Sequence, residues 1–274
     1  MICFPNAKVN LGLNIVGVRP NGYHDLETVF YPIGLCDVLE IVPSRSGATT
    51  LECYGRKVDC PMEKNLVYKA FELMRKEFDV PPVEMYLYKH IPDGAGLGGG
   101  SSDASSALKM IDTIFSLGLS DDDLAKRAAT LGADCPFFIY NKPLKATGVG
   151  DVFAPVDLSL AGKTMVLVKP DVSVSTKLAY SKVVPKPSDC ALESLLAKPM
   201  AEWNGTVKND FEKSVFAEFP ELVGIKAGLT EAGAEYSAMS GSGSAIFGIF
   251  DNAKMAENAV AKVGKYNHFV IALH

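Results

Sequence analysis

The stretch Ile91-Pro-Asp-Gly-Ala-Gly-Leu-Gly-Gly-Gly-Ser-Ser-Asp-Ala104 decides how the rest of the chain is interpreted. Its five glycines lie between a predicted strand, Val83–Ile91, and a predicted helix that begins near Ser101. Glycine permits positive φ and lets the backbone approach a ligand closely. Successive N–H groups can then converge on one anion, and the helix N-terminus adds its unpaired N–H groups. We therefore predict a loop that binds a triphosphate through Pro92, Asp93, Gly94, Ala95, Gly96, Leu97, Gly98, Gly99, Gly100, Ser101 and Ser102.

Three other structures could account for a loop of this sequence. A plain turn needs one or two glycines, and five would lose much chain entropy on folding. A Walker A loop is excluded because no Gly-Lys-Ser/Thr follows. The letters GxGxxG, at Gly94–Gly99, also fit a dinucleotide-binding Rossmann unit, which is the runner-up. That unit needs an acidic residue at the end of the next strand, whereas Asp112 lies inside a predicted helix and Asp121–Asp123 open another.

Composition limits the classes of protein that this chain can belong to. Its 274 residues suffice for one large domain or two ordinary ones, and a formal net charge of -5 argues against a nucleic-acid partner. The six cysteines show no zinc-ligand spacing, so we expect free thiols. No apolar run approaches the roughly 20 residues of a membrane span, and no signal peptide is recognised. We expect a cytoplasmic protein without a membrane partner, either a monomer or a weak homodimer.

Hydrophobic periodicity predicts an α+β chain. Lys8–Val18 alternates as a half-buried strand and is followed by turn residues at 19–22. Further predicted strands are Leu26–Val42 with a break near Gly34, Val83–Ile91, Thr164–Lys169, Ala245–Phe250 and His268–Leu273. Predicted helices are Asn65–Phe78 with Asn65 as N-cap, one from Ser120 to Gly132, Ser175–Val183, Cys190–Ala197, Val207–Phe219, Glu221–Ala232 and Ala253–Val263. Antiparallel strands with helices on one face are the simplest packing of this order.

A loop-rich segment, Leu144–Val156, is the expected junction between two domains. We place one domain, which contains the Gly-rich loop, at residues 1–155 and a second α+β domain at residues 156–274. The family resemblance given next implies that the first is the ATP-binding domain and the second binds the substrate.

Three motifs resemble those of the GHMP kinases, a family that includes galactokinase, homoserine kinase and mevalonate kinase. Pro5-Asn-Ala-Lys-Val-Asn-Leu-Gly-Leu13 resembles the first motif, Pro92–Ser102 the second and Ser240-Gly-Ser-Gly-Ser-Ala245 the third. The resemblance covers essentially the whole chain, in the right order. It implies a two-domain GHMP kinase fold, with an N-terminal mixed-sheet nucleotide-binding domain, a C-terminal ferredoxin-like substrate domain, and the active site in the cleft between them.

Finer features resemble one branch of this family, which phosphorylates the 2-hydroxyl of a cytidine diphosphate-linked sugar alcohol in the non-mevalonate isoprenoid pathway. Two positions depart from that branch: Cys135 stands where an aliphatic residue is expected, and Tyr180 where phenylalanine is common. Another GHMP kinase, of the homoserine or mevalonate type, stays as the alternative. The matching segments are Arg19-Pro-Asn-Gly-Tyr-His24, Lys64-Asn-Leu-Val67, Gly132-Ala-Asp-Cys-Pro136, Val174-Ser-Thr176 and Asn209-Asp-Phe-Glu212.

Phosphoryl transfer requires an aligned hydroxyl, neutralised phosphate charge and an acceptor for the hydroxyl proton. The resemblance implies Asp134 as the general base and Lys8 as the cation that supports it. Local sequence alone favours plainer interpretations, a solvated or capping aspartate in a turn and a surface lysine at the start of a strand. The resemblance also implies ATP as donor and Mg²⁺ as its counter-ion, although we assign no metal-binding acidic residue.

The resemblance further implies the residues that recognise the two small molecules. Aromatic rings stack on a base and polar groups read its edge. Tyr23 and Tyr180 would sandwich the cytosine, and His24 would read its edge. The other implied substrate contacts are Asn10, Thr176, Gly241 and Gly243, and the implied adenosine contacts are Asn65 and Lys89.

Overall fold

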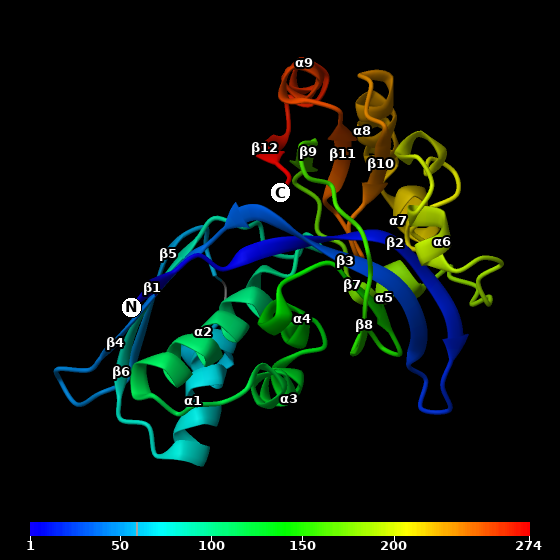
Figure 1. Cartoon of the computed structure of the whole chain (residues 1–274). Helices are drawn as coiled ribbons and strands as arrows, with labels where there is room; N and C mark the ends of the chain where they lie inside the picture. The colour runs from blue at the N-terminus through cyan, green and yellow to red at the C-terminus, as the bar shows by residue number, and fades with distance from the viewer. Residues whose placement is uncertain (59) are drawn as a thin grey trace. The chain divides into compact units, whose positions relative to one another are not determined.

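The computed structural model describes residues 1–58 and 60–274, and its chain is traced in Figure 1. These residues form two compact units, each of which is discontinuous in sequence. Unit 1 contains Met1–Ala7, Leu35–Asp93 and Gly98–Lys142, and unit 2 contains Lys8–Gly34, Gly94–Leu97 and Pro143–His274. The domain boundary expected between residues 155 and 156 stays a prediction.

Unit 1 is built on a four-stranded mixed sheet. Its strands β1 (Ile2–Cys3), β4 (Val38–Pro43), β6 (Val83–Lys89) and β5 (Thr50–Gly55) follow the order β1-β4-β6-β5. β4 runs antiparallel to β6, whereas β5 runs parallel to it. Buried and partly buried side chains alternate along β6, because only one face of this sheet meets the core.

Helices cover the buried face of this sheet (Figure 1). They are α1 (Leu66–Phe78), α2 (Gly99–Phe115), α3 (Asp121–Leu131) and α4 (Cys135–Tyr140), with a short 3₁₀ turn at Met62–Lys64 before α1. Side chains such as Phe71 of α1 and Ile111 of α2 pack with Leu39 and Met85 of the sheet. Asn65 begins α1 as predicted, since its Oδ1 accepts from the amide of Val67 at 2.9 Å.

Unit 2 contains two further sheets. The first has the order β2 (Asn6–Val18), β3 (His24–Cys36), β7 (Leu144–Thr147), β8 (Val152–Pro155). The second is antiparallel throughout, with the order β10 (Tyr236–Met239), β11 (Ile246–Phe250), β9 (Thr164–Lys169), β12 (Asn267–Ala272). The helical segments are α5 (Thr176–Tyr180), α6 (Leu192–Leu196), a 3₁₀ turn at Met200–Glu202, α7 (Glu212–Glu218), α8 (Pro220–Glu231) and α9 (Ala253–Val263). Helices α8 and α9 pack against β11 and β9.

The mixed and antiparallel sheets confirm the predicted α+β class. The helix α2 is followed by another helix, α3, so the second half of a Rossmann unit is missing. All six cysteines lie within the described residues and are free thiols, as expected. Among the helices of the described residues, none is long and apolar enough to cross a bilayer.

Three local predictions were wrong. The strand predicted over Leu26–Val42 breaks at Asp37 instead of Gly34, because the Asp37 carboxylate accepts from the amides of His90 and Ile91. The segment Leu144–Val156 is the hairpin β7–β8 and not a loop. The helix predicted from Val207 begins only at Glu212, since residues 207–211 bond to β2 through Leu13. Besides the hairpin β7–β8 and the two 3₁₀ turns, the strands β1, β5 and β10 and the helix α4 were not predicted.

Candidate active site

The Gly-rich loop alternates between glycines in the left-handed region and buried apolar anchors. Gly94, Gly96 and Gly98 have φ values of 58°, 75° and 72°. Between them, Ala95 and Leu97 are buried. The helix α2 begins at Gly99, and the preceding Gly98 is its N-cap residue. This alternation requires glycine at three of the five predicted positions.

The loop engages its carbonyl groups and leaves its amides open. Ala95 O accepts from the amide of Ala245 at 3.2 Å, and Leu97 O accepts from the amide of Lys8 at 3.0 Å. Within the described residues, no amide from Gly94 to Ser101 donates to a protein acceptor. Such unpaired N–H groups at a glycine turn and a helix start form an anion site. The geometry therefore agrees with a loop that binds phosphate.

The third motif, Ser240–Ala245, packs against the centre of this loop within unit 2. Gly96 O accepts from Ser240 Oγ at 2.8 Å. Gly241 and Gly243 both have positive φ, at 53° and 86°, and Gly243 N donates to Ser240 O across the turn. The Cα of Gly96 lies 3.2 Å from the point where a Cβ on Gly241 would stand. The turns at Gly96 and Gly241 thus pack with their backbones in direct contact, which glycine allows because it has no Cβ.

Asn209 supports the third motif, a role that the sequence did not indicate. Its Nδ2 donates to Met239 O and to Gly241 O, both at 2.8 Å, and its Oδ1 accepts from the amide of Phe211 at 3.0 Å. The side chain is 5% exposed. An asparagine is the side chain of this length that offers two donors and an acceptor together.

We expect Asn209→Ala to lower the free energy of unfolding by about 3 kcal/mol, because buried backbone groups lose their partners. Asn204→Ala is the matched control, since Asn204 is exposed and donates only to Glu235 O, at 2.7 Å. The control is expected to lose less than about 1 kcal/mol. Urea unfolding of both variants tests this, and equal losses would contradict the supporting role of Asn209.

Lys8 is buried, unlike the surface lysine that the local sequence alone favours. It is 3% exposed, and its Nζ donates to Asn10 Oδ1 at 2.8 Å and to Gly96 O at 3.1 Å. The ammonium also lies 4.8 Å from the centre of the Phe30 ring. Asn10 is buried as well, and its Nδ2 donates to Thr28 Oγ1 at 2.9 Å. The structure thus brings the predicted residues Lys8, Asn10 and Gly96 together.

Asn65 and Lys89, the predicted adenosine residues, line one cavity of unit 1. The cavity has a volume of about 190 Å³. Its lining includes Asp93 and Gly100 of the loop and the apolar residues Leu66, Leu87 and Ile91. These apolar side chains offer contact surface to a nucleobase, and Asn65 offers hydrogen-bonding groups beside them.

Lys89 belongs to a buried ion cluster, which the sequence did not indicate. The ammonium pairs with Asp37 and, at 2.6 Å, with Asp103 Oδ2. Asp37 is fully buried, and Asp103 is 2% exposed. The other oxygen of Asp103 is buried without a hydrogen-bond partner. Burial raises the pKa of Asp103 to about 7, since Lys89 offsets only part of this shift and Asp37 adds like charge.

This raised pKa predicts a pH dependence of stability. Between about pH 4 and pH 7 the folded chain keeps a proton on Asp103 that the unfolded chain releases, so the free energy of unfolding falls as pH rises. One such proton gives a slope of about 1.4 kcal/mol per pH unit at most. Asp103→Asn removes that slope. We expect the difference in unfolding free energy between wild type and variant to fall across this window, whereas a constant difference would contradict the shift.

The aromatic residues predicted to bind cytosine lie in unit 2. The ring of Tyr180, on α5, lies 4.6 Å from the ring of His24 and 4.7 Å from that of Phe211. Tyr23 is 64% exposed, and its ring contacts no other aromatic ring within the described residues. The structure therefore pairs Tyr180 with His24, whereas no ring contact joins Tyr23 to either of them in the described part of the chain. Thr176 begins α5, one residue after its N-cap Ser175.

Asp134 lies directly before α4 in unit 1. It is half-buried and is the N-cap residue of that helix, but its side chain makes no capping bond. The next residue, Cys135, is buried, and Ser105 Oγ donates to its carbonyl oxygen at 2.7 Å. Burial raises the pKa of the Cys135 thiol to about 11, so this cysteine is an unreactive packing residue.

No metal centre is built from side chains in the part of the chain that the structure describes. Groups of three or more His, Cys, Asp or Glu that could hold an ion are absent there. Mg²⁺ does not need such a cage, since it commonly binds through substrate phosphates and water.

Comparison with known proteins identifies the family. The models of the GHMP kinase N-terminal and C-terminal domains match residues 65–142 and 191–268. The 4-diphosphocytidyl-2-C-methyl-D-erythritol kinase of Bacteroides fragilis is 54% identical over 252 residues, which cover 91% of this chain and 92% of that protein. The corresponding kinase of Parabacteroides distasonis is 52% identical and covers 92% of both chains.

Solved structures agree with this result. A crystal structure of 4-(cytidine 5'-diphospho)-2C-methyl-D-erythritol kinase matches with a TM-score of 0.84 and 33% identity, over 100% of this chain and 99% of that one. A homoserine kinase from Cytophaga hutchinsonii, at 17% identity and a TM-score of 0.74 over 98% and 95% of the two chains, shares the fold alone. The open phosphate loop, the packed third motif and these matches lead to one conclusion: the chain is a kinase that belongs to the GHMP superfamily and, within it, to the 4-diphosphocytidyl-2-C-methyl-D-erythritol kinase family.

Proposed function

We propose that this kinase transfers the γ-phosphoryl group of ATP to the 2-hydroxyl of 4-diphosphocytidyl-2-C-methyl-D-erythritol, a step of the non-mevalonate route to isoprenoid precursors. The row of open amides from Gly94 to Ser101 is the observation that carries the proposal. Those groups can bind the phosphates of ATP, and relatives at 54% and 52% identity bear the name of this kinase. ATP is the donor that kinases of this superfamily use.

The nucleotide is proposed to bind through the loop and the cavity of unit 1. The phosphates accept from the loop amides, and the hydroxyls of Ser101 and Ser102 add donors. The adenosine occupies the cavity lined by Asn65 and Lys89. The buried carboxylates of Asp37 and Asp103 fix the Lys89 ammonium, which limits its motion when the nucleotide is absent. Mg²⁺, bound to the ATP phosphates, supplies positive charge that offsets theirs.

Asp134 and Lys8 are proposed as the catalytic pair. The Asp134 carboxylate accepts the proton of the 2-hydroxyl, which makes the oxygen a better nucleophile. The Lys8 ammonium stabilises negative charge as the alkoxide develops. Its burial strengthens that effect, because a charge removed from water interacts more strongly with its neighbours.

The cytidine end of the acceptor is proposed to bind at the aromatic residues of unit 2. Tyr23 and Tyr180 stack on the two faces of cytosine, and His24 reads its edge. Asn10 and Thr176 contact the sugar alcohol, whereas the amides of Gly241 and Gly243 bind the diphosphate. Tyr180 is already oriented by its contact with Phe211, so stacking on it loses little side-chain entropy.

An acceptor panel tests this assignment. ATP consumption is measured with 4-diphosphocytidyl-2-C-methyl-D-erythritol, homoserine and mevalonate in separate reactions. We expect turnover with the cytidine compound alone, and a KM at least about tenfold higher in Tyr180→Ala, which loses one stacking face. Turnover with homoserine or mevalonate that is indifferent to Tyr180 would assign the chain to another acceptor class.

A further inference from the structure

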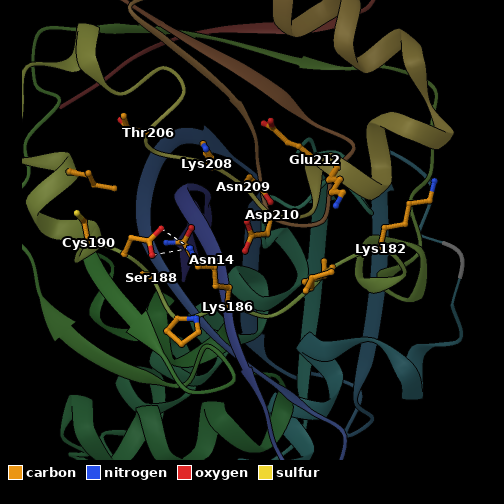
Figure 2. A pocket seen from close by; sticks show the side chains of 16 residues that line it. Asn14, Lys182, Lys186, Ser188, Cys190, Thr206, Lys208, Asn209, Asp210 and Glu212 are labelled. Atoms are coloured by element: carbon orange, nitrogen blue, oxygen red, sulfur yellow. Dashed lines mark hydrogen bonds and ion pairs between the residues drawn. The ribbon is translucent and has the colours of Figure 1, made fainter.

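Unit 2 contains a cavity that the proposed kinase site does not use. Its volume is about 570 Å³, which lies within the range of small-molecule sites. Residues of the segments 182–190 and 206–213 line it, together with Asn14 of β2 and Leu195 of α6 (Figure 2). The lining residues, all of them described, include none of the proposed substrate contacts Asn10, Tyr23, His24, Thr176, Tyr180, Gly241 and Gly243.

Lysines dominate the charge of this cavity. Four line it, and only Lys186 is paired, with Asp189 at 2.8 Å. The other three, Lys182, Lys208 and Lys213, are exposed, and none has an ion-pair partner within the described chain. They come from two separate segments, 182–190 and 206–213.

The acidic residues of the lining are largely engaged elsewhere. Glu212 pairs with Lys226 at 2.6 Å, and its other oxygen accepts from the amide of Met239 at 2.9 Å. Asp210 Oδ2 accepts from the amide of Ile15 at 2.7 Å. The cavity lining therefore contains, among the described residues, three lysines without an ion-pair partner and one aspartate, Asp210, without one. On a chain with a formal net charge of -5, this cavity is a local site of attraction for anions.

We propose that this cavity binds a small phosphorylated molecule that also carries hydroxyl groups. Ammonium groups are compact point charges that suit phosphate oxygens. Figure 2 shows Lys208 beside Asn209 and Asp210, and Lys182 farther out on the other side of these two residues.

The centre of the cavity offers groups for the hydroxyls. The Asp210 carboxylate keeps one oxygen that can accept from a hydroxyl, and the amide of Asn14 can donate to one. A phosphorylated polyol can bond to these two groups directly, whereas inorganic phosphate leaves them to water, so we expect the polyol to bind more tightly. This inference does not depend on which acceptor the kinase uses.

Calorimetric titration tests the site with two probes, ribose 5-phosphate and inorganic pyrophosphate. We expect saturable binding of ribose 5-phosphate to the wild-type chain, tighter than that of pyrophosphate, and at least about tenfold weaker binding to Lys208→Gln/Lys213→Gln, because two phosphate partners are lost. Equal affinity for the two probes would contradict the role of the hydroxyl groups. The matched control is Lys254→Gln/Lys262→Gln on α9, which removes the same charge from exposed positions outside the cavity. The control is expected to bind within about twofold of wild type, as only long-range attraction changes.

The outcomes separate the proposal from its alternatives. Kinase turnover and the KM for the cytidine substrate should not change in Lys208→Gln/Lys213→Gln, and a raised KM would mean that the cavity is part of the substrate site. Equally weak probe binding in both double variants would mean that net charge, and not the cavity, causes the loss of affinity. Either result, or the failure of both probes to bind the wild-type chain, overturns the proposal.

Discussion

Asp134→Asn is expected to lower kcat by about a thousandfold while the fold is retained. A positioned general base contributes between about a hundredfold and ten-thousandfold to a reaction of this kind, and an amide cannot accept the hydroxyl proton. The side chain of Asp134 makes no capping bond to α4, and asparagine has nearly the same size, so we expect the helix to form in the variant. KM values for both substrates should change little, because the lost interaction belongs to the transition state.

The control for this variant is Asp157→Asn, which removes the same charge from an exposed position. Steady-state kinetics and thermal unfolding are measured for both proteins. Turnover in Asp134→Asn within about tenfold of wild type would remove Asp134 from the role of base. A large loss in both variants would point to net charge instead of chemistry.

Gly96→Ala is expected to be the most destabilising single change in the phosphate loop. Gly96 has a φ of 75°, and a Cβ there would stand 2.1 Å from Ser240 O and 2.9 Å from the carbon of the same carbonyl. Both are backbone atoms that cannot rotate away, so the loop and the third motif have to separate. We expect the free energy of unfolding to fall by at least about 3 kcal/mol, and kinase activity to be lost.

Gly94→Ala is the matched control within the same loop. Its φ is also positive, at 58°, but the nearest atom to a Cβ, Ser173 Oγ, is 4.0 Å away. That variant bears the backbone strain alone, about 1 kcal/mol. Urea unfolding followed by the fluorescence of Trp203 compares the two, and equal stability of both variants would contradict the close packing at Gly96.

Elements with strong local signals could be predicted from the sequence. The helix α1 begins after Asn65 because that side chain caps the next turn, and this cap is visible in sequence. The central strand β9 is a continuous apolar run, typical of a strand buried on both faces. The hairpin β7–β8 was missed because Gly148 and Gly150 dominate a short segment whose strands have only four residues each.

The chemistry of the site was predictable only in part. Five glycines in one loop indicate an anion site, since few other uses require so much bare backbone. Asp37 contacts Lys89 across 52 sequence positions, and Asn209 contacts Gly241 across 32. No local pattern reports such pairs. Two features of the sequence could have indicated the ion cluster. Asp37 stands between two apolar strands, and Asp103 is a charged residue among the buried positions of α2.

The central claim is transfer of the γ-phosphoryl group of ATP to one alcohol of a cytidine diphosphate-linked acceptor. Phosphorus NMR of a reaction with 4-diphosphocytidyl-2-C-methyl-D-erythritol and ATP tests it most directly. We predict that the γ-phosphate signal of ATP declines as one new phosphomonoester signal grows in equal amount, without proton coupling because C2 carries no hydrogen, while the acceptor's diphosphate signals persist. Conversion of ATP to ADP and free phosphate, or a phosphomonoester on another carbon, would contradict the account.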